Sequence, residues 1–99
     1  MNFTRNISGD KFTLAIQGMI DTANAPAFEA EVQNAIPKTK ILELDFSQVE
    51  YISSSGLRVL LNAHKEKIAT GKLVLANVNE TVMDVFKMTG FSKVLTIVQ

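Results

Sequence analysis

The chain has 99 residues, of which 46% are hydrophobic and 20% are charged, and this composition is typical of one globular domain over residues 1–99. Ten Lys and Arg residues balance ten Asp and Glu residues without forming blocks of like charge, which argues against nucleic-acid binding because phosphate backbones need clustered cations. Cysteine is absent, which excludes disulfides and thiolate metal sites. Neither a signal peptide nor a run of about 18 apolar residues is visible, so we expect a cytoplasmic protein without membrane insertion.

The first predicted elements in chain order are a hairpin and a helix. Alternating polar and apolar residues over 3–8 and 11–17 predict two strands joined by a glycine-containing turn, and Gly18 is expected to end the second strand. Asn24 is a candidate cap for the helix that follows, and Pro37 is expected to end it.

The rest of the chain alternates strands with helices. The predicted elements are a strand over 41–46 that continues extended over 49–52, a helix from the following serines to a cap at Gly71, a strand over 72–76, a helix over 80–89 and a strand over 94–98. The resulting order, β-β-α-β-α-β-α-β, predicts an α/β fold in which helices pack mainly on one face of a mixed sheet.

Apolar spacing also predicts which helical residues are buried. In the middle helix the buried stripe is expected to contain Leu57, Leu60, Leu61, His64 and Ile68. Met83 and Met88 flank the apolar face of the last helix and are expected in the core, with an adaptable contact surface as the alternative.

Three consecutive serines stand where the third strand runs into the middle helix. Ser53, Ser54 and Ser55, followed by Gly56, place hydroxyl groups where the first backbone N–H groups of a helix lack intrahelical partners. In the simplest interpretation Ser53 or Ser54 caps the helix and Gly56 permits close packing.

Three ordered segments resemble the STAS domain, named for sulfate transporters and anti-sigma factor antagonists. Asp45-Phe46-Ser47 and Ser54-Ser55-Gly56-Leu57 are similar to the family signature, a D-x-S strand end followed by D-S-S-G-L or a close variant. Gly18-Met19-Ile20-Asp21 resembles the turn before the first helix, and 77–90 resembles the C-terminal portion. The resemblance covers nearly the whole chain and favours the anti-sigma factor antagonist type.

The resemblance implies a function that is switched by phosphorylation. In antagonists of this family the first serine of S-S-G is phosphorylated by the partner, an anti-sigma factor that is also a GHKL-type serine kinase, and a PP2C-type phosphatase removes the phosphate. By position the acceptor is Ser54, although Ser53 stands where Asp is usual, which leaves Ser53 and Ser55 as competing acceptors. The unmodified protein is then expected to bind the anti-sigma factor and release the sigma factor.

The residues expected to contact the partner surround this serine, and they are Asp21, Ser53, Ser55, Gly56 and Arg58. Arg58 follows Ser54 by four residues, so it is a candidate to reach the phosphate along the helix surface. The alternatives are a turn or capping role for Asp21 and a solvated side chain for Arg58.

Other function classes fit less well. A serine hydrolase needs a base beside its nucleophile, but His64 lies ten residues from Ser54, or about 15 Å along one helix. The carboxylates show no metal-ligand spacing and no glycine-rich phosphate loop is present, so we expect no metal, no cofactor and no enzymatic activity. The remaining alternatives are a non-switching STAS scaffold in a transporter or stressosome-like complex, and a STAS module that binds a small ligand.

Overall fold

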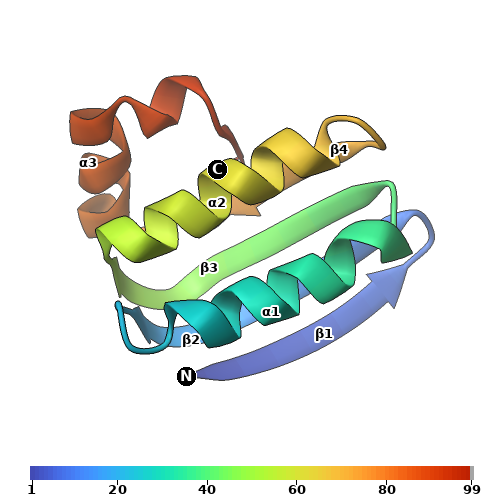
Figure 1. Ribbon diagram of the computed structural model, residues 1–99, viewed down its shortest axis with the longest axis horizontal. Coiled ribbons are helices and arrows are strands. Elements are labelled where there is room, and N and C mark those ends of the chain that lie inside the picture. Colours follow the sequence, from blue (N-terminus) through green and yellow to red (C-terminus); the bar gives the residue numbers. More distant parts are fainter. Residues whose placement is uncertain (99) are drawn as a thin grey trace.

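The computed structural model describes residues 1–98, which form a five-stranded mixed sheet with three α-helices (Figure 1). The strands are β1 (Asn2–Ser8), β2 (Lys11–Ile20), β3 (Ile41–Ile52), β4 (Lys72–Ala76) and β5 (Thr96–Val98). The helices are α1 (Ala25–Ala35), α2 (Ser54–Lys67) and α3 (Glu80–Thr89), with short 3-10 turns η1 (Ile36–Lys38) and η2 (Phe91–Lys93). The predicted element order and fold class are confirmed.

The sheet has the spatial order β1-β2-β3-β4-β5, in which β1 and β2 are antiparallel and the other neighbours are parallel. Helices α1 and α2 lie side by side on one face, and α3 lies at the end of the sheet where β3 runs into α2 (Figure 1). A hydrogen bond of 2.8 Å from the Asn79 amide nitrogen to the Val49 carbonyl fixes the start of α3 against β3.

The core lies between the sheet and the helices α1 and α2. Alternate residues of β2 and β3 are buried there, together with one stripe from each helix, and members of this core include Leu14, Ile16, Leu42, Leu44, Phe46, Phe28, Val32 and Leu60. This burial is the main favourable term in folding. It also fixes the register of the sheet, because a slip of one residue would turn these side chains to solvent.

The prediction that Gly18 ends the second strand is wrong. β2 continues through Gly18, whose φ of +116° suits glycine, and the pairing with β3 shifts register on either side of it. The glycine therefore accommodates an irregularity within the strand rather than ending it. As a result Ile20 pairs with Ile52, and the segment after β2 lies beside the serines that open α2.

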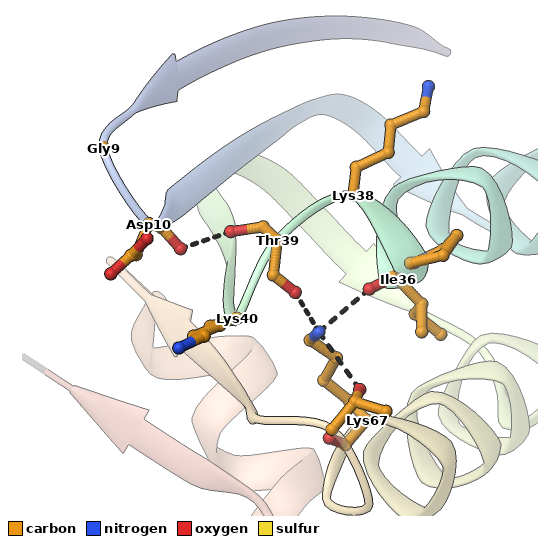
Figure 2. A pocket seen from close by; sticks show the side chains of 9 residues that line it. Gly9, Asp10, Ile36, Lys38, Thr39, Lys40 and Lys67 are labelled. Atoms are coloured by element: carbon orange, nitrogen blue, oxygen red, sulfur yellow. Dashed lines mark hydrogen bonds between the residues drawn. The ribbon is translucent and has the colours of Figure 1, made fainter.

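The predicted buried stripe of α2 is wrong at its C-terminal end. Ile68 is 66% exposed, whereas Lys67 is 1% exposed. The Lys67 ammonium donates hydrogen bonds to the carbonyl oxygens of Ile36, at 2.9 Å, and Thr39, so it satisfies acceptors at the end of α1 (Figure 2). Burial lowers the pKa of Lys67. Lys67 therefore occupies the buried position that was predicted for Ile68, and its hydrogen bonds link α2 to the segment before β3.

Gly71 is not the cap of α2. The helix ends at Lys67, and Gly71 lies against the backbone of Lys40, where an added Cβ would be 1.9 Å from the carbonyl oxygen. Its lack of a side chain is thus required by a close approach of two chain segments. The hydrogen bond of 2.9 Å from Lys72 N to Lys40 O follows directly and starts the pairing of β4 with β3.

Two expectations for the C-terminal part are also corrected. Met88 is 86% exposed and does not belong to the core. Met83 is partly buried and packs against the core. The last strand covers only Thr96–Val98, because the N–H groups of Val94 and Leu95 donate to the Phe91 carbonyl and continue the turn that η2 begins. Within residues 1–98, no helix is both long and apolar enough to cross a membrane.

Candidate functional site

The start of α2 is held by Ser53, which confirms the prediction that one of the serines caps this helix. Ser53 has an extended backbone, and its hydroxyl accepts a hydrogen bond of 3.3 Å from Gly56 N. Its own N–H donates to the carbonyl of Ile20 at 2.8 Å. The capping residue is therefore tied to the end of β2, and the position of the two serines that follow is fixed by the sheet.

The other two serines differ in their surroundings. Ser55 is a half-buried residue, and its hydroxyl lies 3.3 Å from the Thr22 hydroxyl, across the space between the starts of α1 and α2. Ser54 is the first residue of α2 and is exposed. Among residues 1–98 its hydroxyl has no hydrogen-bond partner. Of the three hydroxyl groups, that of Ser54 is the one left free for an external group.

Gly56 is buried directly beneath the serines. A Cβ at this position would lie 2.7 Å from a side-chain carbon of Ile20 and 2.7 Å from one of Ile52. These distances are well inside van der Waals contact. The glycine therefore lets α2 start close against the ends of β2 and β3, and it determines how far Ser54 stands from the sheet.

Asp21 forms a closed turn with Asn24 beside the serines. The Asp21 carboxylate accepts from Asn24 N at 2.9 Å, and the Asn24 side-chain oxygen accepts from Asp21 N at 2.8 Å. The Asn24 amide also donates to the Met19 carbonyl at 2.7 Å. Asn24 occupies the N-cap position of α1 as predicted, but its side chain bonds backwards to this turn instead of to the helix. Asp21 is half-buried and fills the turn role considered from the sequence.

Arg58 is exposed on α2 and lines a shallow groove of about 200 Å³ between the starts of α1 and α2. The other lining residues are Thr22, Ala25, Pro26, Glu29, Ser55 and Val59. The structure thus brings Arg58 beside Ser55 and the first turn of α1. The sequence reasoning did not single out Thr22 or Glu29, because their proximity to α2 depends on the packing of the two helices.

The D-x-S segment, Asp45-Phe46-Ser47, lies in β3 and makes hydrogen bonds next to the strand end that leads to this site. The Asp45 carboxylate accepts from Ser47 N at 2.9 Å and from the Asn77 amide nitrogen at 3.0 Å. Burial alone would raise the pKa of Asp45, but the hydrogen bonds from Asn77 and Ser47 outweigh it and hold that pKa below its usual value. Asp45 therefore connects β3 to the turn after β4, where Asn77 adopts a φ of +59°.

Two exposed apolar side chains near the ends of β2 and β3 were not singled out by the sequence analysis. Met19 is 48% exposed and Tyr51 is 45% exposed. Each lies one residue before the paired strand ends Ile20 and Ile52. Their position next to the recognised motifs was the available signal, but the strand alternation that exposes them depends on the irregular register at Gly18.

The electrostatic character of the site follows from the helix start. The first turn of α2 contains no acidic residue, so the partial positive charge of the helix N-terminus is not offset there.

His64 lies on the same helix, half-buried, and its Nδ1 atom has no hydrogen-bond partner within the described part of the chain. In residues 1–98 no group of three His, Cys, Asp or Glu side chains is placed to hold a metal ion.

Residues 2–99 match the model of the STAS domain, and the chain belongs to the STAS domain family. Within the family it is of the anti-sigma factor antagonist type. BtrV of Bordetella bronchiseptica, provisionally named as an anti-sigma factor antagonist, is 36% identical over 84 residues, which cover 83% of this chain and 72% of BtrV. The anti-sigma-B factor antagonist of Listeria monocytogenes is 27% identical over 90 residues, which cover 89% of this chain and 79% of that protein.

Solved structures share the fold. The anti-sigma factor antagonist SpoIIAA in its unphosphorylated form has a TM-score of 0.80 at 20% identity, covering 99% of this chain and 89% of that one. The phosphorylated form of SpoIIAA from Bacillus has a TM-score of 0.72 at 20% identity, covering 99% of this chain and 92% of that one.

Proposed function

We propose that residues 1–99 act as one STAS domain, an anti-sigma factor antagonist that works in the cytoplasm by binding and catalyses no reaction itself. In its unmodified form it binds an anti-sigma factor that is also a GHKL-type serine kinase, and the sigma factor is released. Phosphorylation of Ser54 by that kinase ends the binding, and a PP2C-type phosphatase restores it. The observation that carries the proposal is the exposed hydroxyl of Ser54 at the start of α2.

The hydrogen bonds of the three serines support Ser54 as the acceptor. Ser53 uses its hydroxyl to cap α2, and phosphorylation there would remove the cap. The Ser55 hydroxyl contacts that of Thr22 at 3.3 Å, so phosphorylation there would break this contact. Ser54 requires neither change. Its oxygen would attack the γ-phosphorus of ATP and lose its proton to the kinase, with ADP leaving.

The fold is suited to carry the added charge. A phosphoserine brings about −1.5 to −2 charges and three acceptor oxygens, and the start of α2 offers unpaired N–H groups and no acidic side chain. A helix N-terminus stabilises an anion at this position. The core residues beneath Ser54 therefore need not move when the phosphate is added. SpoIIAA, which has the same fold, is a protein whose phosphorylated form has been solved.

The same charge would oppose docking. The proposed contact surface contains the exposed Ser54 with Asp21, Ser55 and Arg58. A phosphate in the middle of such an interface must lose its water, which costs several kcal/mol where the partner offers no cation. Ser53 and Gly56 contribute to this surface by positioning the start of α2, because Gly56 is buried and Ser53 is engaged as the cap.

Arg58 would set how strongly the phosphate is held on the free protein. It is exposed one turn after Ser54 and beside Ser55 in the groove. A guanidinium near the phosphate stabilises the dianion, so in Arg58→Ala the second pKa of phosphoserine 54 should rise. Titration by phosphorus NMR measures this, with Asn62→Ala on the same helix as the control. An unchanged pKa in Arg58→Ala would remove Arg58 from the proposal.

The acceptor is tested by incubating the protein with its cognate anti-sigma factor kinase and ATP, followed by intact-mass spectrometry. Wild type, Ser53→Ala and Ser55→Ala should each gain one phosphate, whereas Ser54→Ala should gain none. Equal incorporation into wild type and Ser54→Ala would reject Ser54 as the acceptor. Circular dichroism of all four proteins shows whether a loss of phosphorylation reflects a loss of fold.

A further inference from the structure

β1 is an edge strand with a long unpaired side. It is the first strand in the sheet order, so only one of its two edges is paired. That edge pairs with β2 from Asn2 to Ser8 without a register shift. Figure 1 shows β1 outside the layer formed by α1 and α2. Proteins protect such edges with charged side chains, proline, bulges or short length. The opposite edge is short, since β5 has three residues, but β1 has seven residues with no proline or bulge, and its one charged side chain, Arg5, is paired with Glu31.

The backbone groups that point outward can be assigned from the hairpin. Ser8 and Lys11 flank its two-residue turn and therefore form a hydrogen-bonded pair. Hydrogen-bonded and non-hydrogen-bonded pairs alternate along an antiparallel ladder. The N–H and C=O groups of Phe3, Arg5 and Ile7 therefore point away from β2, towards whatever lies beyond the edge.

The side chains of the same three residues lie on the face of the sheet that carries the helices. Their partners in β2 are Ile16, Leu14 and Phe12, which are all buried on that face. Ile7 is nevertheless 67% exposed and Phe3 is half-buried. Arg5 lies between them and forms an ion pair with Glu31 of α1, with 3.1 Å between Nε and Oε2. The edge thus presents two apolar side chains around a neutralised charge.

We infer that β1 pairs with β1 of a second copy of this chain, antiparallel about a two-fold axis at Arg5. In that register Phe3 lies opposite Ile7 of the other copy, and Thr4 lies opposite Asn6. The outward N–H and C=O groups of Phe3, Arg5 and Ile7 then face the same groups of the second copy and can hydrogen-bond with them. Phe3 and Ile7 also gain an apolar neighbour in the other copy. Each Arg5 faces its copy, but Glu31 already neutralises it.

The pairing joins two five-stranded sheets into one and leaves the start of α2 outside the contact, because neither Ser54 nor the groove beside it belongs to β1. One short strand from each copy forms a contact at the low end of interface sizes. The association is therefore weak and depends on concentration. A dimer of this kind would present two Ser54 sites at once.

The register is tested with cysteine pairs, since the chain contains no cysteine of its own. Thr4 and Asn6 are exposed, and the proposed dimer places them directly opposite each other as a non-hydrogen-bonded pair at a Cα distance of about 4.5 Å, which suits a disulfide. Two Thr4→Cys residues, or two Asn6→Cys residues, would be offset along the strands. Mixing Thr4→Cys with Asn6→Cys under mild oxidation should therefore give mixed dimers at least tenfold above either homodimer.

Mass spectrometry separates the three products, and a mixture of Thr4→Cys with Asn62→Cys on α2 is the matched control. Crosslinking in statistical proportions, or equal crosslinking in the control, would overturn the inference.

Self-association is tested separately by sedimentation equilibrium up to millimolar concentrations. Ile7→Lys should abolish the dimer, whereas Ile68→Lys, at a residue of similar exposure on α2, should leave it unchanged. The melting temperature of both variants shows that they fold. A wild type that stays monomeric throughout, as expected if the edge instead receives a strand of another protein, would refute the dimer, and so would an Ile7→Lys variant that dimerises like wild type.

Discussion

The replacement Gly56→Ala tests the close packing that positions Ser54. The added Cβ would lie 2.7 Å from carbon atoms of both Ile20 and Ile52, whereas carbon atoms rest about 3.5–4.0 Å apart. Both isoleucine side chains are fully buried, so each has to move by about 1 Å within a packed core. Overpacking of this kind typically costs about 1–3 kcal/mol.

A smaller gain acts in the opposite direction, because alanine is the better helix former by up to about 1 kcal/mol. We therefore expect Gly56→Ala to lower the free energy of unfolding by about 1–2 kcal/mol, which corresponds to a fall in melting temperature of about 4–16 °C for a domain of this length. Urea unfolding followed by circular dichroism measures the change. Asn62→Ala, at an exposed position of the same helix, controls for helix propensity and should not destabilise the protein. A Gly56→Ala protein as stable as wild type would refute the packing argument.

Three further variants test the contacts that frame the site. Ser53→Ala removes the N-cap of α2 and should cost about 1 kcal/mol in urea unfolding; no loss would mean that the cap is dispensable. Lys67→Met leaves the carbonyls of Ile36 and Thr39 without their donor and should lower the unfolding free energy by about 1–3 kcal/mol, measured in the same way. An unchanged or higher stability would show that removing the buried charge outweighs those bonds. The folded-state pKa of Asp45 lies below the ordinary 3.8, so its stabilisation is present above pH 3.8 and is lost as the pH falls through the folded-state value. Asp45→Asn should therefore destabilise the protein more at pH 7 than at pH 3, and an equal effect at both values would contradict this assignment.

Most of the architecture could be predicted from the sequence because apolar residues recur with the strand or helix period over nearly every element. The bounds of β4 and α3 were predicted to the residue, since both are short and clearly delimited. The errors arose where tertiary contacts override local pattern. Lys67 is buried because it finds carbonyl acceptors on a segment 28 to 31 residues away in sequence, and no helical periodicity predicts that. Gly71 is needed for a backbone approach and not for a helix cap.

The candidate site shows the same division. A cap among the serines could be predicted, because the hydroxyl and the helix start are local in sequence. The distinction between the serines could not, since it depends on Thr22 approaching Ser55 and on Ile20 accepting a hydrogen bond from Ser53. These contacts exist because β2 extends past Gly18 and places the following turn beside α2.

The central claim is that charge on Ser54 prevents docking while the fold remains intact. The most direct measurement compares the affinity of the anti-sigma factor for unmodified protein and for protein phosphorylated at Ser54, by titration calorimetry, together with the melting temperature of each form. We expect the phosphorylated form to bind at least about 100-fold more weakly, equivalent to about 2.7 kcal/mol, with a melting temperature within a few degrees of the unmodified form. Equal affinity of the two forms, or a phosphorylated form that has lost its fold, would contradict the account.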